Sequence, residues 1–371
     1  MHHPKVLYLS VDSIQEGVGY SQVFTYLRQL STHFEITLVS FEKVRPSASF
    51  ERELQGLNIH WLHYPFKPTT ALTILERAWI LFKNLKGAEL VHARGNFCGF
   101  VASLSGAKKI IWDCRALVGI QRGSIKKSSS KNFIEKLFWN FTESRCAKKA
   151  SRIITITEKT IPYLAKKHKV SINKFEHIGT NVDLSRFKQS PYPDARNRLR
   201  FLLLGEMTTY YDLEYFESVV SALKKKVNVE VDWLTPIPND ALARKYGFNI
   251  IQNANNAMIE KTIHKAHFGV SILKKDLGIS RLSISPTKNA EFLASGRPLL
   301  LDTAQGDLGE DVMRCNIGVS TSEQKAISEV VDEILNLSHD KNVASRCYEF
   351  ARDHYDLRLA VERLRRVYAE S

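Results

Sequence analysis

Short apolar runs of strand length alternate with segments of helix length along most of this 371-residue chain. Near the start, Lys5–Ser10 and Ile36–Ser40 are two such runs, and the spacing of apolar residues predicts a helix between them, from Ser21 to about Leu30. Buried strands that alternate with helices are typical of parallel sheets covered on both faces. The sequence therefore predicts an α/β fold with doubly wound parallel sheets, in which ligands bind beyond the carboxyl ends of the strands.

This pattern occurs twice, before and after a proline-containing segment at Pro191–Ala195. A chain of this length also exceeds the usual size of a single core. We therefore expect an N-terminal domain over 1–190, a C-terminal domain over 196–352, and a last helical segment, 353–371, that packs back toward the N-terminal domain. The further strands expected lie at 58–63, 90–92, 110–112, 152–156, 199–204, 229–234, 248–251, 268–273 and 298–301.

Positive charge is concentrated in the first half of the chain. Residues 1–195 contain 29 Lys and Arg against 15 Asp and Glu, whereas 196–371 contain 24 of each, so the first half carries all of the formal net charge of +14. Such asymmetry indicates an anionic partner for the N-terminal half. No recognised nucleic-acid-binding module is present, so we expect no nucleic-acid partner.

The segment 122–152 is the most basic part, with nine basic and two acidic residues among several aromatic ones. One interpretation is that a helix near 133–147 packs Phe133, Leu137 and Phe141 into the core and leaves its lysines solvated. The other is that this helix rests on an anionic membrane surface, as interfacial basic helices do. We favour the membrane interpretation.

The cysteines and the apolar runs constrain where the chain functions. The five cysteines are scattered and none forms a CxxC pair, which indicates neither a disulfide framework nor a structural zinc site. No apolar run approaches the roughly 20 residues that span a bilayer, and the N-terminus enters a strand without the features of a signal peptide. We therefore expect a cytoplasmic protein that is peripheral at the inner face of the membrane.

The stretch Ser285–Pro298 is the most informative motif. Pro286 suits the first position of a helix, where its missing N–H costs nothing, and Ser285 suits the N-cap before it. A helix N-terminus at the carboxyl end of a strand attracts anions. Lys288 and Glu291 lie three apart and share a face, where they could hold a diphosphate and a ribose diol. The alternative is a capped helix with a solvated charge pair.

Four stretches of the chain, taken in order, form a recognisable series. They are the glycine loop Gly17–Val23, the strand segment Phe34–Lys43, the segment Ile153–Glu158 and the motif Ser285–Pro298. In this order they resemble the GT-B glycosyltransferases, specifically the large retaining family GT4. The last stretch resembles the donor-binding helix of a subgroup that reads Ser-Pro-Thr-Lys there. The resemblance implies two Rossmann-like domains that face a central cleft. It also implies a nucleotide diphosphate sugar (a UDP- or GDP-sugar) as co-substrate, with no cofactor. No Asp-x-Asp pair offers a magnesium site, so we expect no metal.

The resemblance also assigns donor-binding residues. Many family members carry two Glu residues seven positions apart; Glu291 matches the second, which contacts the ribose, while Ser283 stands at the first. The loop Gly205–Asp212 lacks the cations that many members use for the diphosphate, so this charge would come from Lys288 with Lys274 or Arg281. The donor-binding residues expected on this basis are Gly205, Thr208, Lys274, Arg281, Ser285, Thr287, Lys288 and Glu291.

Polar residues that follow the strands of the first domain are candidates for catalysis and acceptor binding. We expect His92, Asp113 and Arg115 to be catalytic together with Lys288. The acceptor-binding residues expected are Gly17, Gly19, Tyr20, Arg94 and Glu158. The alternatives are a structural histidine at position 92, a local ion pair between Asp113 and Arg115, and stabilisation of a helix start by Glu158.

The function implied is that of a retaining glycosyltransferase, which would transfer a sugar from the nucleotide diphosphate to a lipid-linked or cell-surface glycan. Hydrogen-bond donors and cations preorganised around the departing diphosphate would make the largest contribution to lowering the activation barrier. The resemblance implies reaction on the front face of the sugar, in which the leaving phosphate takes the proton of the acceptor. Two alternatives remain: a nucleotide-sugar epimerase of the same fold, and a non-catalytic relative that binds nucleotide sugar or glycan.

Overall fold

The computed structural model describes residues 3–120, 130–207, 210–252, 256–322 and 325–371. It consists of two compact units. Unit 1 comprises Met1–Thr180 together with Leu357–Ser371, and unit 2 comprises Asn181–Asp356. The chain therefore crosses between the units at 180/181 and again at 356/357, whereas the boundaries predicted from the sequence lie near 190–196 and at 352/353.

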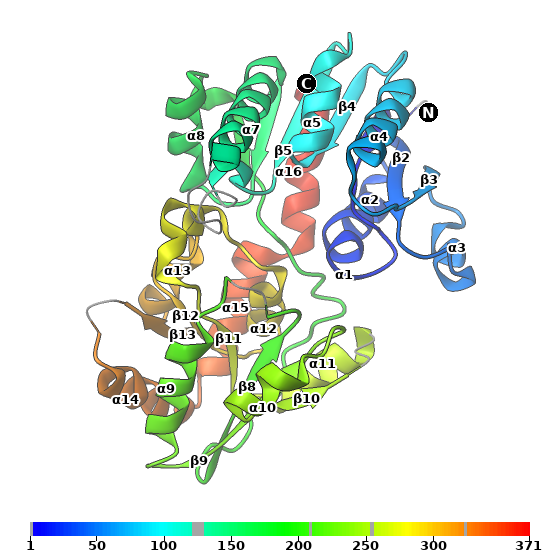
Figure 1. Cartoon of the computed structure of the whole chain (residues 1–371). Coiled ribbons are helices and arrows are strands. Elements are labelled where there is room, and N and C mark those ends of the chain that lie inside the picture. Colours follow the sequence, from blue (N-terminus) through cyan, green and yellow to red (C-terminus); the bar gives the residue numbers. More distant parts are fainter. Residues whose placement is uncertain (1–2, 121–129, 208–209, 253–255, 323–324) are drawn as a thin grey trace. The chain divides into compact units, whose positions relative to one another are not determined.

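Unit 1 is built on a seven-stranded sheet in the order β3-β2-β1-β4-β5-β6-β7, in which every neighbouring pair is parallel (Figure 1). Side chains alternate between its two faces, because successive residues of a strand point in opposite directions. Val6 and Tyr8 belong to one cluster of buried apolar residues, and Leu7 and Leu9 to another. The strands are β1 (Lys5–Leu9), β2 (Glu35–Glu42), β3 (Ile59–Pro65), β4 (Leu90–Arg94), β5 (Lys109–Cys114), β6 (Arg152–Thr155) and β7 (Phe175–His177).

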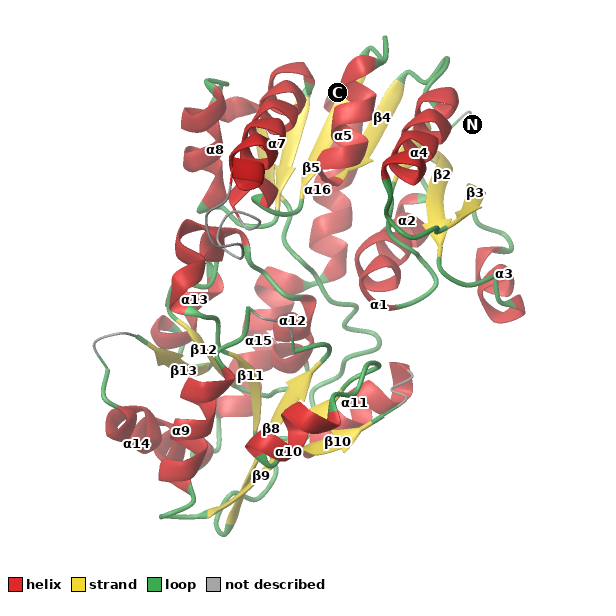
Figure 2. Cartoon of the chain, viewed as in Figure 1, coloured by secondary structure: helices red, strands yellow, loops and turns green. Residues whose placement is uncertain are grey.

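Helices cover both faces of this sheet (Figure 2). The cluster around Val6 packs on α2 and α16, and the cluster around Leu7 packs on α4 and α5, beside which α7 lies. The last helix of the chain thus belongs to the core of unit 1. The helices of unit 1 are α1 (Gly17–Gly19), the π-helix η1 (Tyr20–Phe24), α2 (Thr25–Leu30), α3 (Ala48–Leu54), α4 (Ala71–Asn84), α5 (Gly95–Leu104), α7 (Ser130–Lys149), α8 (Thr160–His168), the 3₁₀ turn η2 (Ile172–Lys174) and α16 (Leu357–Glu370).

Unit 2 contains a six-stranded sheet in the order β10-β9-β8-β11-β12-β13, again with parallel neighbours throughout. Its strands are β8 (Arg198–Leu204), β9 (Asn228–Leu234), β10 (Asn249–Ile251), β11 (Phe268–Ser271), β12 (Leu299–Asp302) and β13 (Gly318–Thr321). Its helices are α9 (Leu213–Leu223), α10 (Asp240–Tyr246), α11 (Asn256–Lys265), the 3₁₀ segment η3 (Lys275–Ser283), α12 (Thr287–Ala294), α13 (Leu308–Arg314), α14 (Ile327–Ser338) and α15 (Val343–Tyr355). The predicted α/β fold with two doubly wound parallel sheets is confirmed.

The position of α12 on the sheet depends on one glycine. Gly269 in β11 lies so close to the ring of Phe292 that a Cβ atom built on it would stand 2.4 Å from the ring. Because only glycine leaves this space, the fully buried Phe292 can pack directly against the backbone of β11. This contact fixes α12, and with it the Ser285–Pro298 motif, over the centre of the sheet.

The proline-containing segment after residue 190 is part of unit 2 and is held there by Arg297. The Arg297 side chain is fully buried and donates to the carbonyl oxygens of Ser190 (3.2 Å), Pro191 (2.9 Å) and His264 (2.8 Å). Burial lowers the pKa of its guanidinium to about 10, which leaves it charged at neutral pH. Carbonyl acceptors of two segments that are distant in sequence, at 190–191 and 264, therefore compensate for the desolvation of this cation.

Candidate active site

The N-terminus of α12 lies at the carboxyl end of the unit 2 sheet. The helix begins at Thr287, and Pro286 is its N-cap residue with an extended backbone (φ −69°, ψ 133°), whose carbonyl accepts from the N–H of Asn289 at 3.0 Å. The predicted start, with Pro286 inside the helix and Ser285 as its cap, was therefore wrong by one residue. Proline suits both positions, because neither needs its N–H and its φ is compatible with both. Ser285 and Thr287 are half-buried.

Lys288 is buried in a small cage at this helix start. Its Nζ donates to the carbonyl oxygen of Leu204, the last residue of β8, at 3.2 Å. The same Nζ lies 4.2 Å from the centre of the Tyr211 ring, a cation–π contact. Gly205 follows Leu204 with φ +86°, a conformation that favours glycine, and its carbonyl accepts from Nε1 of Trp233 at 2.8 Å. Lys288 is thus held against the turn that leaves β8.

Two loops at the same edge of the sheet pair with each other. The N–H of Asp212 donates to the carbonyl of Ile272 at 3.0 Å, and the N–H of Lys274 donates to the carbonyl of Tyr210 at 2.8 Å. Tyr211 therefore forms an antiparallel bridge with the segment after β11, which fixes its ring beside Lys288. The backbone hydrogen bond to Tyr210 thus places Lys274, a predicted donor-binding residue, at this edge of the sheet. Thr208 lies outside the described residues.

Arg281 is paired within the protein. Its Nη1 donates to Oδ2 of Asp302 at 2.8 Å, and the two side chains are 17% and 9% exposed. Asp302 ends β12, so this ion pair ties the η3 segment to the strand end. Ser283, at the position of the family's first Glu, is buried and donates its hydroxyl to the carbonyl of Ser280 at 2.9 Å. It therefore holds the η3 turn together.

Glu291 is partly buried, one helical turn beyond Lys288. Burial raises the pKa of its carboxyl to about 7, although the positive charges of Arg186 and Lys288 act in the opposite direction. This carboxyl therefore changes its protonation state near neutral pH. The N-terminus of α12 accordingly presents one fixed cation and one carboxyl that titrates in the physiological range.

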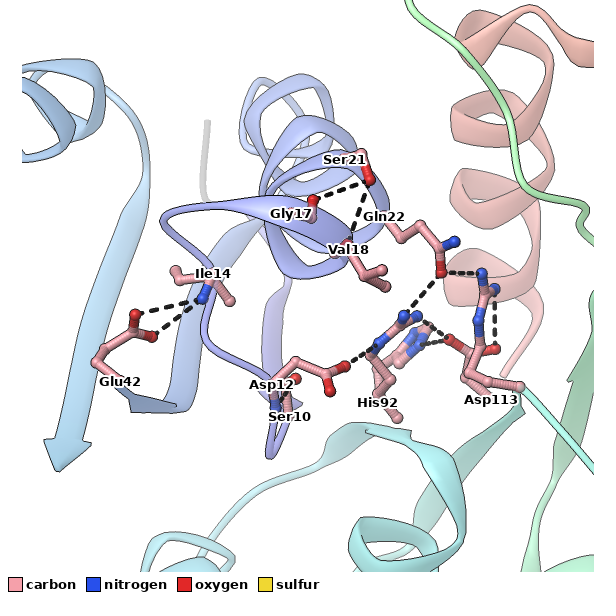
Figure 3. A network of polar contacts seen from close by, with 12 residues as sticks. Ser10, Asp12, Ile14, Gly17, Val18, Ser21, Gln22, Glu42, His92 and Asp113 are labelled. Atoms are coloured by element: carbon pink, nitrogen blue, oxygen red, sulfur yellow. Dashed lines mark hydrogen bonds and ion pairs between the residues drawn. The ribbon is translucent and has the colours of Figure 1, made fainter. Parts of the chain in front are cut away.

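A second polar network lies in unit 1, at the carboxyl ends of β1, β4 and β5 (Figure 3). Arg94 donates from Nε to Oδ2 of Asp12 and from Nη2 to Oε1 of Gln22, each at 2.8 Å. Arg115 donates to the same oxygen of Gln22 at 2.7 Å. Asp113 lies between the two guanidinium groups, 3.4 Å from Nη1 of each. The structure thus brings three predicted residues together: Arg94, Asp113 and Arg115.

The charges of this network balance one another. Burial on its own raises the pKa of Asp113, but Arg115, His92 and Arg94 outweigh it and hold the pKa well below its ordinary value. Asp113 is therefore ionised. With Asp12 it offsets the two arginines, and Asp12 has the most exposed side chain of the four, at 43%. The network is suited to hydrogen-bonding a polar hydroxylated ligand rather than to attracting an anion.

His92 lies beside Asp113 in this network, and its side chain is 2% exposed. Its ring stacks on Tyr8 with 4.3 Å between ring centres, and its Nδ1 lies 2.9 Å from the hydroxyl of Tyr368. Its Nε2 faces Oδ2 of Asp113 at 3.6 Å. Burial lowers the pKa of His92, although the nearby carboxylate of Asp113 acts in the opposite direction. The ring is thus a neutral, enclosed group, as in the structural-histidine interpretation.

The glycine loop enters its helix through close packing. Gly17 has φ +56°, and a Cβ atom on Gly19 would stand 1.8 Å from the carbonyl oxygen of Ser13. The buried carboxylate of Glu42 holds this loop by accepting from the Ser13 hydroxyl at 2.8 Å and from the N–H of Ile14 at 3.2 Å. The π-helix that follows is a feature often found at functional sites, and here it carries Gln22 to the two arginines.

Two predicted acceptor-binding residues contact other parts of unit 1. The hydroxyl of Tyr20 donates to Glu53 of α3 at 2.8 Å. Glu158 is 72% exposed and pairs with Nδ1 of His177, at the end of β7, across 3.3 Å.

Several residues of the two sites were not predicted from the sequence. Asp12 follows a strand end, which is a signal that could have identified it. The other partners carry no local signal, because each lies far along the chain from the residue that it contacts. The missed residues are Asp12, Gln22, Glu42, Arg186, Tyr211, Asp302 and Tyr368.

Comparison with known proteins identifies the fold. Neither a protein-family model nor a curated protein sequence matches this chain. Solved structures do match over the full length. The HepE protein of Anabaena in complex with UDP-glucose superposes with a TM-score of 0.72 at 11% identity, covering 100% of both chains. The chain has the GT-B fold.

Other GT-B matches extend the comparison. A glycosyltransferase from Rickettsia africae superposes with a TM-score of 0.68 at 14% identity, covering 100% of this chain and 99% of the other. WaaG, a glycosyltransferase involved in lipopolysaccharide biosynthesis, superposes with a TM-score of 0.65 at 13% identity, covering 99% and 100%. In this GT-B protein, both polar networks lie at the carboxyl ends of their own sheets, where doubly wound folds bind ligands.

Proposed function

We propose that this chain is a retaining glycosyltransferase that transfers a sugar from a UDP- or GDP-sugar to a lipid-linked or cell-surface glycan. The observation that carries the proposal is that buried Lys288 and Glu291, whose carboxyl has a pKa raised by burial, lie one turn apart in the first half of α12. The full-length likeness to HepE, whose structure holds UDP-glucose, and to WaaG supports the donor class and the acceptor class.

The donor chemistry follows from where charge develops. During transfer, the bond between the sugar and the diphosphate oxygen breaks, and negative charge develops on the diphosphate. Hydrogen-bond donors and cations that already lie beside the diphosphate therefore lower the activation barrier. The helix dipole of α12 and the ammonium of Lys288 converge on this place. Tyr211 and the carbonyl of Leu204 already hold Lys288, so that little reorganisation accompanies the reaction. The ionised carboxylate of Glu291 would accept hydrogen bonds from the ribose diol.

The acceptor would bind at the network around Asp113. Asp12 is its accessible carboxylate, and Arg94, Arg115 and Gln22 offer donors and an acceptor for sugar hydroxyls. In front-face retaining transfer, the acceptor oxygen attacks the anomeric carbon and its proton passes to the leaving phosphate. We therefore assign His92 a positioning role rather than that of a base, because it is enclosed and its pKa is lowered.

We further propose that the protein is cytoplasmic and attaches peripherally to the inner face of an anionic membrane through the 122–152 region. Part of that region, 122–129, lies outside the described residues, as does the side chain of Phe133. On α7, the side chains of Leu137, Phe138 and Phe141 are 53%, 51% and 59% exposed, which argues against the alternative that this helix buries them. No helix in the described part of the chain is long and apolar enough to cross a bilayer.

A nucleotide screen tests the donor class. The melting temperature of the purified chain would be measured with UDP, GDP, UDP-glucose, a GDP-sugar and, as the control, AMP. A diphosphate nucleotide at 100 times its dissociation constant stabilises the native state by about 2.7 kcal/mol, so a clear upward shift is expected for one base and none for AMP. If no diphosphate nucleotide raises the melting temperature, the proposal fails.

A second assay separates transfer from epimerisation. The chain would be incubated with its UDP-sugar in the absence and in the presence of a membrane glycolipid extract. A glycosyltransferase produces a lengthened glycan only when the extract is present. Release of an epimerised sugar without any acceptor would favour the nucleotide-sugar epimerase.

A further inference from the structure

The outer face of α4 is apolar and exposed. Leu72, Leu75, Trp79 and Phe82 follow one another at spacings of three and four residues, which places them on one side of the helix. Their exposed fractions are 78%, 66%, 67% and 44%. We call these four side chains the α4 face. Apolar residues scattered singly over a surface need no explanation, but four on one helical stripe mark an interaction site.

The helix itself is well anchored, so the exposure of the α4 face is a property of the fold. Thr70 caps the helix start and shares a reciprocal capping box with Thr73. On the inner side, Leu81 and Leu85 are buried in the cluster that joins α4 and α5 to the sheet. The core therefore already has its apolar contacts from this helix, and the α4 face is left for a partner.

The charges around the α4 face indicate the kind of partner. The only carboxylate in the α4 sequence is Glu76, and it is paired with Lys67 at 2.5 Å. Two exposed lysines, Lys83 and Lys86, lie at the end of the helix. Helix α5 lies beside α4 (Figure 1). It is followed by two more exposed lysines, at 108 and 109. An apolar stripe with a cationic end and a balanced carboxylate matches the surface of an anionic bilayer, whose headgroups attract lysines and whose acyl boundary accepts apolar side chains.

The identity of the exposed residues points the same way. Tryptophan is enriched at the level of lipid headgroups, because its ring is apolar and its N–H is polar. Lysines at the end of an inserted stripe can extend toward the phosphate groups while their aliphatic stems stay in the apolar layer. A second copy of the chain suits the face less well. A parallel two-fold contact through α4 would place Lys83 and Lys86 near their own equivalents, where like charges repel. An antiparallel contact would place them near the start of the partner's helix, and the only carboxylate of α4, Glu76, is already paired with Lys67.

We propose that α4 lies flat in the headgroup layer of an anionic membrane, with the α4 face inserted and Lys83 and Lys86 on the phosphates. The inference rests on the proposed function only in that a lipid-linked acceptor gives the enzyme a reason to be there. It adds a defined insertion element in unit 1, separate from the 122–152 region that the sequence indicates. Binding to vesicles needs no nucleotide sugar, so it can be measured independently of the donor site.

Vesicle co-sedimentation tests the proposal. The full chain would be mixed with vesicles of phosphatidylcholine alone and with vesicles of phosphatidylcholine and phosphatidylglycerol at a ratio of 7:3. We expect the wild type to sediment with the anionic vesicles. The double variant Leu75→Ser/Trp79→Ser should bind them at least tenfold more weakly. Both side chains are exposed, so the variant should retain the wild-type melting temperature.

A matched control replaces two equally exposed apolar residues of unit 2, Ile237 and Met313, which are 60% and 51% exposed. The variant Ile237→Ser/Met313→Ser should bind anionic vesicles as the wild type does. Quenching of tryptophan fluorescence by brominated lipid should be lost selectively in Trp79→Phe. Equal binding by the wild type and the α4 variant would overturn the proposal. A dimer that dissociates in the α4 variant, with no vesicle binding by the wild type, would assign the face to a second copy instead.

The UDP-dependent melting shift, measured on the same samples, separates the two proposals. Loss of vesicle binding with an intact UDP shift in the α4 variant supports the insertion element. A wild type that binds UDP but no anionic vesicles overturns the insertion element and leaves the donor site standing. A wild type that binds vesicles but no nucleotide supports the insertion element and contradicts the proposed function.

Discussion

The hydroxyl of Tyr368 lies 2.9 Å from Nδ1 of His92 and connects the last helix of the chain, α16, to the middle of β4. His92 is neutral because burial lowers its pKa. With its proton on Nε2, the ring accepts a hydrogen bond from Tyr368 and directs Nε2 toward Asp113. The C-terminal segment thereby orients a residue beneath the network that we propose for the acceptor.

Tyr368→Phe should therefore lower the free energy of unfolding by about 1–3 kcal/mol, because it leaves the buried Nδ1 of His92 without a donor. Chemical denaturation monitored by circular dichroism measures this loss. Tyr348→Phe on α15, a half-buried tyrosine, serves as the control and should stay within about 0.5 kcal/mol of the wild type. Equal stabilities for the two variants would show that the contact with His92 contributes nothing.

Lys288→Met should weaken nucleotide binding while preserving the fold. Methionine is about as long as the lysine stem and can fill the space beside Tyr211, but it removes the charge that we propose for the diphosphate. We expect the UDP affinity to fall at least tenfold, and the rate of sugar transfer to fall by roughly 10²–10³-fold, as for the loss of one preorganised donor. Isothermal titration with UDP gives the first number, and Lys261→Met, an exposed lysine on α11, is the control. A variant that binds UDP as tightly as the wild type would remove Lys288 from the site.

Most of the fold could be predicted because its signals are local. Most strands are short apolar runs and many helices show their own periodicity, so most of the alternation that defines the two sheets can be read one segment at a time. The exceptions are β7 and β13, which read Phe-Glu-His and Gly-Val-Ser-Thr; they contain no apolar run and were not predicted. The turn glycine Gly205 and the Ser285–Pro298 motif are equally local. The helix start within that motif was misplaced by one residue because Pro286 suits both the N-cap and the first helical position.

The rest depends on contacts between distant segments. Tyr368 meets His92 across 276 positions of sequence and Arg94 meets Asp12 across 82, so no periodicity or spacing could pair them. The same holds for the proline-containing segment near residue 191. Its composition is typical of a linker, but Arg297 binds it to unit 2, and that contact spans 106 positions.

Gly19→Ala should disrupt the glycine loop of unit 1. The new Cβ atom would stand 1.8 Å from the carbonyl oxygen of Ser13, so the loop that Glu42 holds has to move. Overpacking of this kind costs typically 1–3 kcal/mol, and it should displace Gln22 from the two arginines. Gly106→Ala is the matched control, because a Cβ atom there meets nothing within 4 Å, and it should leave the melting temperature unchanged. Denaturation curves of the two variants that coincide would contradict the packing argument.

Glu291 should give the protein a pH dependence near neutrality. Because burial raises the pKa of its carboxyl from 4.5 to about 7, the native state keeps a proton that the unfolded chain has already released in this range. The native state then binds more protons than the unfolded state, so the contribution of Glu291 to stability falls as the pH rises from about 4.5 to about 7. Glu291→Gln removes this contribution. We therefore expect the free energy of unfolding of this variant to rise relative to that of the wild type as the pH increases across this window.

If the ribose diol needs the ionised carboxylate, the affinity for UDP-glucose should rise through about pH 7 in the wild type and stay flat in Glu291→Gln. Denaturation and titration calorimetry at several pH values measure both effects, with Glu329→Gln on the exposed side of α14 as the control. Parallel pH profiles for the wild type and Glu291→Gln would show that this carboxyl neither titrates in this range nor contacts the donor.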